Sequence, residues 1–295
     1  MREFKSYHPI VNFAFFLCVI LLTCFYLHPI FIGVSFLCGF IYSVMTGGKR
    51  ALGFNFLFVV PLILITAVIN PLFNHGGITI ISYFPNGNPL TAESIIYGIA
   101  SGAMLASVII WFSSYNKIMT SDKFIYLFGK VIPALSLILS MALRFVPRFK
   151  EKFEEIRVGQ KCIGKGMNNG NIFQRIKNAL RIISIMITWA LENSVETADS
   201  MRSRGYGLSG RGAFSNFIFD KRDAKAFGCI LIFAIYTIIG IIWGDLDYTY
   251  FPSFKVTPPT LYAVSIFISY ILLCSSPIII EIYEAIRWKL LKQKI

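Results

Sequence analysis

One short segment of the chain has the residue types of a phosphate-binding loop. Gly159 to Gly166 matches the first seven positions of the nucleotide-binding pattern GxxxxGK(S/T). Gly166 occupies the eighth position, so the hydroxyl group that would hold Mg²⁺ is missing. The preceding residues also follow a helical pattern, where this loop requires a strand. The sequence therefore disfavours nucleotide binding, and any ATP-driven action has to come from a partner protein.

A second segment, Met201 to Gly207, places two arginines at the end of a predicted helix. Arg202 and Arg204 precede Gly205, which suits the left-handed conformation in which many helices end. Two interpretations fit this pattern equally well. The arginines could offset the helix dipole, an effect of about 0.3–1 kcal/mol. Alternatively, a rigid helix end could present their planar guanidinium groups to carboxylates of a partner.

The remaining polar residues form no pattern that could support catalysis or metal binding. The three histidines are scattered without ligand spacing. A proton-coupled carrier or an intramembrane enzyme needs ionisable groups at mid-membrane. Acidic residues are instead found at the edges of the apolar segments: Glu93, Asp122, Glu281 and Glu284. We expect no catalytic residue, no metal site and no cofactor, which counts against a secondary transporter or membrane-embedded enzyme acting alone.

Two long helices should carry the two polar segments. In the first, Phe145, Phe149, Phe153 and Ile156 recur at helical spacing and define one face. This helix should end within the glycine-rich stretch 164–170. The second should begin near Asn171, a suitable N-cap, and end at Gly205, about 33 residues or roughly 50 Å later. Its apolar stripe comprises Ile176, Leu180, Ile183, Ile187, Ala190, Ser194, Thr197, Ala198 and Met201.

The rest of the chain is strongly apolar. Of its 295 residues, 56% are hydrophobic and only 15% are charged, against about 25% charged in soluble domains. Six segments could each span a bilayer: about 11–28, 30–45, 53–72, 94–115, 224–243 and 260–280. Met1 to Thr23 resembles a signal peptide, but the apolar run continues past Cys24, so we expect an uncleaved transmembrane helix. We predict an all-α, polytopic membrane protein with about six transmembrane segments.

The distribution of basic residues favours one orientation of these segments. Residues 71–91 contain no lysine or arginine and residues 244–259 contain only Lys255, whereas the termini and the connections after the second and fourth segments are basic. Because cytoplasmic loops collect lysine and arginine, we expect a multi-pass protein of the cell membrane with both termini cytoplasmic. The net charge of +13 does not indicate nucleic acid as a partner, because no arginine-rich run contains interleaved aromatic residues.

Small residues in the fourth apolar segment should permit close helix packing. Gly98, Gly102 and Ala106 recur every four residues and form a small-xxx-small face. Such a face lets the backbone of another helix approach closely. We expect that helix to belong to the same chain more readily than to a second subunit.

The arginine-rich helix end carries a family resemblance. Within Ala198 to Gly207, the triplet Ser203-Arg204-Gly205 resembles the motif that ends the second coupling helix in the transmembrane T component (EcfT/CbiQ-like) of energy-coupling factor (ECF) transporters. The first motif departs, because Cys162-Ile163-Gly164 has isoleucine where the family has arginine. Other stretches are also similar to family members: Leu143 to Phe149, Glu154, Arg157, Gln160, Asn70 to Phe73, His75, Gly76, Thr91, Glu93, Tyr97, Gly98 and Ser121 to Lys123.

The resemblance implies a subunit of a prokaryotic uptake system with four parts. Two cytoplasmic ATP-binding (ATPase) subunits would hydrolyse ATP, and a small membrane S component would bind a vitamin or metal. The T component, without enzymatic activity, would lie in the lipid bilayer and transmit ATPase closure to the S component. The residues that would then dock the ATPases are Arg202, Ser203, Arg204, Gly205, Lys161, Gly164 and Lys165.

The same reading divides the chain into three parts. Residues 1–115 should form the N-terminal transmembrane helices, 116–223 a cytoplasmic coupling-helix module, and 224–295 the C-terminal transmembrane helices. Arg144 to Asp223 holds 15 basic and 8 acidic residues, as expected of a segment that docks soluble partners.

Overall fold

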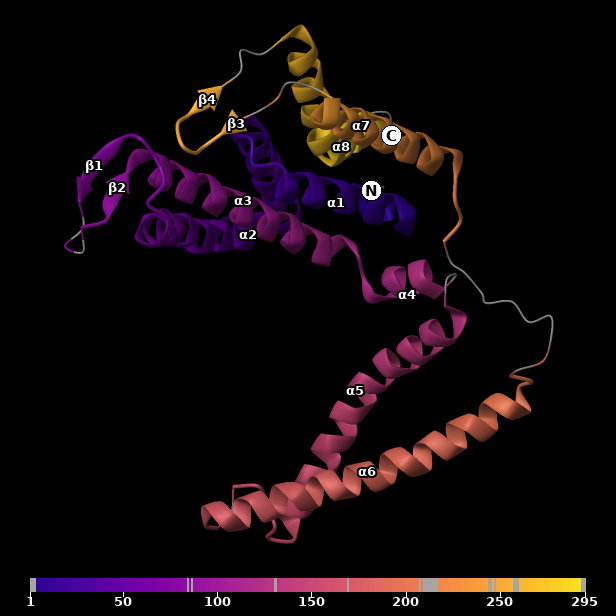
Figure 1. Cartoon of the computed structure of the whole chain (residues 1–295). Helices are drawn as coiled ribbons and strands as arrows, with labels where there is room; N and C mark the ends of the chain where they lie inside the picture. The colour runs from indigo at the N-terminus through magenta and orange to yellow at the C-terminus, as the bar shows by residue number, and fades with distance from the viewer. Residues whose placement is uncertain are drawn as a thin grey trace. The chain divides into compact units, whose positions relative to one another are not determined.

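The computed structural model describes residues 4–83, 85, 87–129, 132–168, 170–206, 208, 217–243, 246, 248–256 and 260–292 (Figure 1). This part of the chain forms eight α-helices and two short two-stranded β-hairpins. It divides into two compact units, Met1–Phe124 with Phe217–Ile295, and Ile125–Asn216. The predicted all-α class is confirmed, and the two hairpins are an addition that the sequence analysis did not predict.

The first unit begins with two helices that each follow a His-Pro pair. After the short 3₁₀ helix η1 (Phe4–Ser6), α1 runs over Pro9–Phe25 and α2 over Pro29–Phe73. The side chains of His8 and His28 accept hydrogen bonds from the second residue of each helix, both at 3.3 Å. Proline suits the first helical position because the N–H there has no partner within the helix.

The 45-residue α2 is bent back on itself at Gly48, whose backbone is not helical (φ 59°, ψ −148°). The rings of Phe40 and Phe56 lie 6.0 Å apart. In a straight helix, residues 16 positions apart would be separated by about 24 Å. α2 is therefore a pair of antiparallel helices, which correspond to the second and third apolar segments of the sequence.

The helix α3 (Ala92–Ile118) packs closely against α2. A Cβ atom added to Gly98 would lie 2.8 Å from the Thr66 carbonyl oxygen, and one added to Gly102 would lie 3.0 Å from the Ile63 Cα atom. Ala106 is fully buried in a cluster with Val59. The small residues of α3 thus face another helix of the same chain.

The connection between α2 and α3 contains β1 (Ile80–Tyr83) and β2 (Pro89–Thr91). Several residues that resemble the family lie here and have structural roles. The Thr91 hydroxyl donates to the Gly76 carbonyl at 2.7 Å. Both carboxylate oxygens of Glu93 accept from the Thr79 N–H, at 3.2 and 3.3 Å. These contacts order the connection and the first turn of α3.

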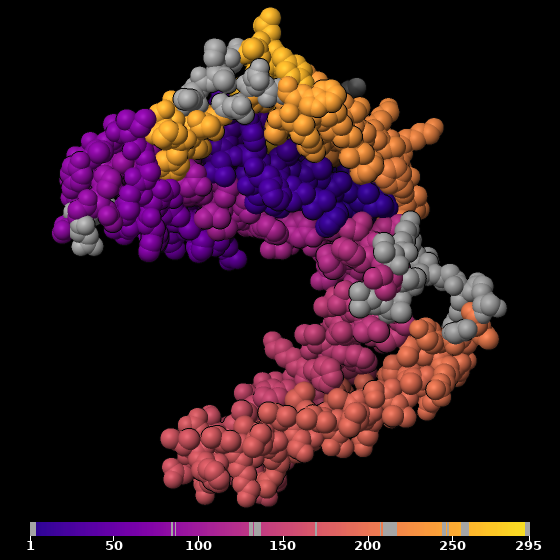
Figure 2. Space-filling model, viewed as in Figure 1, coloured from indigo at the N-terminus to yellow at the C-terminus, as the bar shows by residue number. Residues whose placement is uncertain are grey.

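The helices α7 (Lys221–Trp243) and α8 (Leu261–Lys292) complete the first unit, joined through β3 (Tyr248–Thr249) and β4 (Lys255–Val256). Figure 2 shows α1, in indigo, between α3 and α7. Buried polar side chains connect four helices: the Thr23 hydroxyl lies 2.7 Å from that of Ser35 and 3.1 Å from that of Tyr270. The Trp111 indole N–H donates to Ser35 at 3.0 Å. Such contacts bind helices together where no water can replace them.

In the described part of the chain, four helices are long and apolar enough to cross a membrane: α2, α3, α7 and α8. Large apolar side chains also face outward from them. Leu57 of α2 is 82% exposed, and Val68 is 63% exposed. Exposed apolar surface of this extent is expected where lipid is the solvent. These features confirm an all-α membrane protein, and the number of six spans stays a prediction.

The second unit contains most of α4 (Ser121–Gly129) and two long helices, α5 (Pro133–Cys162) and α6 (Ile172–Ser203). The predicted face of α5 is confirmed, because Phe145, Phe149, Phe153 and Ile156 are all half-buried. The Phe149 ring lies 5.5 Å from that of Trp189 on α6, in an edge-to-face arrangement. Near the turn between the helices, Asn178 donates to the Gly166 carbonyl at 3.1 Å. The two helices are therefore antiparallel.

The limits of α6 follow the sequence prediction, whereas its packing face follows it only in part. Asn171 is the N-cap, and with Gln174 it forms a capping box. The residues of α6 that are buried in this unit include Ile182 and Asn193. The first part of the predicted stripe is exposed, with Ile176 at 54% and Leu180 at 60%, whereas Ala190, Thr197, Ala198 and Met201 are half-buried. The predicted stripe is thus covered only toward the end of α6.

Candidate docking site at the ends of the helix pair

The end of α6 is a left-handed cap that follows Arg204 directly. Gly205 has φ 75°. Its N–H donates to the Arg202 carbonyl at 2.9 Å, and the Tyr206 N–H donates to the Met201 carbonyl at 2.9 Å. This pair of hydrogen bonds defines a Schellman motif, which satisfies carbonyl groups that a helix end otherwise leaves unpaired. The predicted helix end at Gly205 is confirmed.

The end of α5 has the same backbone structure. Gly164 also has φ 75°. Its N–H donates to the Lys161 carbonyl at 3.1 Å, and the Lys165 N–H donates to the Gln160 carbonyl at 2.9 Å. By position in the motif, Ile163 corresponds to Arg204, with backbone angles of −89° and 15° against −81° and 6°. The two triplets compared by sequence are therefore equivalent in their hydrogen bonding.

The two helix ends do not form one site. Because α5 and α6 are antiparallel, the end of α5 lies near the start of α6 (Figure 1). The 32 residues of α6 separate it from Arg204, a distance of about 48 Å along the helix. Lys161, Gly164 and Lys165 thus lie at one end of the pair, and Arg202 to Gly205 lie at the other.

A groove of about 530 Å³ separates α5 from α6 near the end that carries Arg204. Its charged lining consists of Arg144 and Arg148 from α5, and Glu196 and Arg204 from α6. Among the described residues, no ion pair joins these four groups. The remaining lining is Leu137, Ser140, Met141, Asn193, Thr197, Ser200 and Met201. Three guanidinium groups and one carboxylate make this groove suited to an acidic partner.

Arg202 and Arg204 have different surroundings. Arg204 lines the groove, whereas Arg202 is exposed outside its lining. The Ser203 hydroxyl donates to the Ser200 carbonyl at 2.9 Å, so this side chain is used within its own helix. The sequence analysis did not nominate Arg144 and Arg148 as docking residues. Their spacing of four placed them on one helix face, but only the antiparallel packing brings that face to Arg204.

These features define a class: a multi-pass, all-α membrane protein with two long antiparallel helices, each of which ends in a glycine cap. The chain matches the cobalt transport protein (CbiQ) family over residues 5–214, and it belongs to this family. The class and the family match agree with the resemblance seen in the sequence. The prediction of an ECF transporter T component is confirmed.

Curated relatives support the same assignment. The chain is 27% identical over 167 residues to the energy-coupling factor transporter transmembrane protein EcfT of Acidaminococcus fermentans, covering 52% of this chain and 62% of that relative. It is 24% identical to EcfT of Staphylococcus aureus, covering 59% of this chain and 68% of the relative. For EcfT of Brevibacillus brevis the identity is 27%, covering 62% and 71%. The first alignment thus spans less than two thirds of the relative's length.

Proposed function

We propose that this protein is the transmembrane coupling subunit of an ECF-type ABC transporter. Two partner ATPases hydrolyse ATP, and the subunit transmits their movement to a small S component that binds a vitamin or metal. Family membership supports this role, together with the apolar helices and the long α5–α6 pair. Residues 116–223 and both termini lie on the cytoplasmic side in this proposal, as the distribution of basic residues indicates.

The observation that carries the proposal is the position of Arg204. It is the last residue before a rigid left-handed cap, and it shares a groove with Arg144 and Arg148. Arginine in such a place can bind a carboxylate through two parallel hydrogen bonds. We infer that Arg204, with Arg202 beside it, docks one ATPase. Lys161 and Lys165, around Gly164, dock the other more weakly.

The charge-reversing variant Arg204→Glu tests this function. The variant should insert in the membrane and fold as the parent does, but ATP-driven uptake by the assembled transporter should be lost. Lys150→Glu is a matched control, because Lys150 is exposed on α5, outside the groove and away from both helix ends. Full uptake by Arg204→Glu would reject the assignment of this residue. Alanine substitutions at Lys161 and Lys165 test the end of α5. Unchanged ATPase binding would show that neither lysine docks an ATPase.

Purification separates this function from a carrier or an enzyme that acts alone. A coupling subunit should co-purify with two ATPases and a small hydrophobic protein. The purified chain alone should bind neither a vitamin nor a transition metal ion, as measured by isothermal titration calorimetry. Saturable binding of a transport substrate by the isolated chain would favour a secondary transporter.

A further inference from the structure

The segment Phe4–His8 is anchored inside the first unit before α1 begins. Phe4 is fully buried. Its ring lies 5.4 Å from that of Phe15 on α1 and 6.4 Å from that of Tyr42 on α2. Both contacts are edge-to-face, a geometry that aromatic rings favour. The side chain of Phe4 therefore fixes the segment, and its backbone groups are available to hold other elements.

Lys123, in the first turn of α4, binds one side of this segment. Its ammonium group donates a hydrogen bond to the Lys5 carbonyl oxygen. With its amide oriented to satisfy both neighbours, Asn12 accepts from Lys123 Nζ at 2.8 Å and donates to the Phe4 carbonyl at 3.1 Å. Lys123 is only 6% exposed, and burial, together with the charge of Lys5, lowers its pKa to about 8. A buried ammonium group needs such acceptors, because burial without them is costly.

Asp223, in the first turn of α7, binds the other side. One carboxylate oxygen accepts from the His8 N–H at 3.4 Å, and the other accepts from the Asp220 N–H at 3.1 Å. The second bond caps α7, because Asp220 precedes its first residue. The Arg222 guanidinium group lies over the Tyr7 ring, 4.1 Å from its centre. A single carboxylate, 3% exposed, thus joins the start of α7 to the segment.

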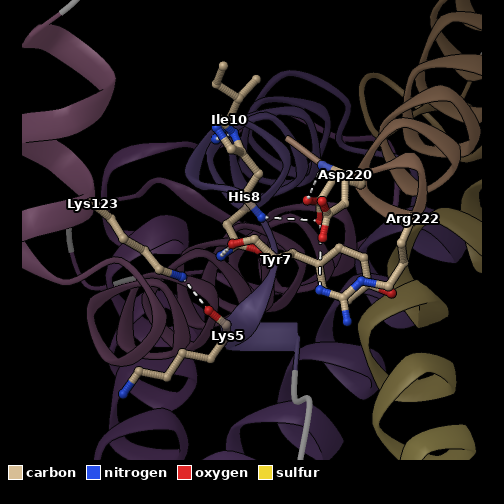
Figure 3. Close-up of polar contacts among 9 residues, drawn as sticks. Lys5, Tyr7, His8, Ile10, Lys123, Asp220 and Arg222 are labelled. Carbon is tan, nitrogen blue, oxygen red and sulfur yellow. Dashed lines mark hydrogen bonds and ion pairs between the residues drawn. The ribbon is translucent and has the colours of Figure 1, made fainter. Parts of the chain in front are cut away.

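These contacts lie where the chain leaves the first unit and returns to it. The unit ends at Phe124, one residue after Lys123, and resumes at Phe217, shortly before α7. Figure 3 shows Lys5, Tyr7 and His8 between Lys123 on one side and Asp220 and Arg222 on the other. The residues bound by Lys123 and Asp223 are Lys5 and His8, only three positions apart.

We propose that Lys123 and Asp223 are positioning residues that fix the start of α4, where the chain leaves the first unit, and the start of α7, where it returns, to one element, the segment Phe4–His8. The inference rests on the proposed function, in which movement of the helix pair drives transport. Helix starts without such contacts would absorb that movement in their own backbone angles, as hinge residues do. Helix starts held to a common buried segment pass the movement to α1, α4 and α7 together.

Hydrogen exchange of the full chain in lipid nanodiscs tests these contacts of Lys123 and Asp223 without any partner protein. Lys123→Met removes the donor to Lys5, and Asp223→Asn leaves one acceptor where two are needed. We expect the amides of α4, the capped amide of Asp220 and the amides of the second turn of α7 to exchange at least about tenfold faster in Lys123→Met. In Asp223→Asn, α7 should respond more than α4. Lys49→Met and Asp199→Asn, both at exposed positions, are matched controls. Unchanged exchange in both test variants would overturn the proposal.

Transport by the assembled complex separates positioning from a purely structural role. Lys123→Met should retain ATP hydrolysis but lower uptake per ATP at least about fivefold, and Lys123→Arg, which keeps the donor, should restore part of it. A parallel loss of uptake and hydrolysis, in proportion to the amount of complex, would reject the positioning role. If Lys123→Met does not accumulate, Asp223→Asn provides the same test. Purification of the chain without any ATPase would instead reject the proposed function and leave the exchange result standing.

Discussion

The ends of α5 and α6 share one backbone structure but carry different side chains. Each helix closes with the same pair of hydrogen bonds around a glycine at φ 75°. Arg204 stands before one glycine, and Ile163, which is 60% exposed, stands before the other. The glycine determines where each helix stops, and the residue before it determines what the helix end can bind. We propose that two unlike ends dock on two unlike ATPase surfaces.

The largest effect is expected when the two ends are made alike by Arg204→Ile. This change keeps the cap and removes the guanidinium group. Truncating one partner of a buried, hydrogen-bonded charge pair costs about 2–5 kcal/mol, so ATPase binding at this end should weaken at least about 30-fold. Surface plasmon resonance with immobilised protein in nanodiscs measures the affinity. Ile163→Ala is the control, and an affinity equal to that of the parent would show that the two ends do not differ in function.

A smaller effect is expected from replacing the glycines themselves. An L-residue in the left-handed conformation costs about 1–2 kcal/mol, so Gly205→Ala and Gly164→Ala should both lower thermal stability. A Cβ atom at Gly205 would lie 2.9 Å from Leu208 Cδ1, whereas none of the described atoms lies within 4 Å of one at Gly164. Gly205→Ala should therefore lower the Tm more. An equal or higher Tm in both variants would contradict the shared cap.

The smallest effect is expected from Ile163→Arg, which gives α5 the residue found on α6. An exposed ion pair contributes about 0.2–1 kcal/mol, so ATPase affinity should rise no more than about fivefold. Ile163→Gln is a control of similar length without the charge. If Ile163→Arg weakens binding, the socket at this end is apolar, and the isoleucine is itself the docking residue.

The local features of the second unit could be predicted from sequence because each depends on neighbouring residues. Asn171 and Gly205 mark the limits of α6 through capping chemistry that acts within a single turn. The groove around Arg204 could not be predicted in this way. Arg144 and Arg204 are 60 positions apart in the sequence, and only the antiparallel packing of α5 on α6 makes them neighbours.

In the first unit, too, features set by neighbouring residues could be predicted, whereas contacts between residues far apart in the sequence could not. The gap between the second and third apolar segments, 30–45 and 53–72, includes Gly48, where α2 reverses. The contact between His8 and Asp223 joins residues 215 positions apart, and no local pattern indicates it. The predicted stripe on α6 is exposed at its start and half-buried toward its end, and periodicity alone does not tell which part of an apolar face is covered.

The buried contact between Trp111 and Ser35 has a use in spectroscopy. Trp111 is fully buried in the first unit, and Trp189 packs against Phe149 in the second. The chain has four tryptophans, and the other two, Trp243 and Trp288, are exposed. A variant with phenylalanine at positions 243 and 288 would carry one tryptophan in each unit. The emission of such a protein would report the opening of the helical bundle and of the α5–α6 pair without any attached dye.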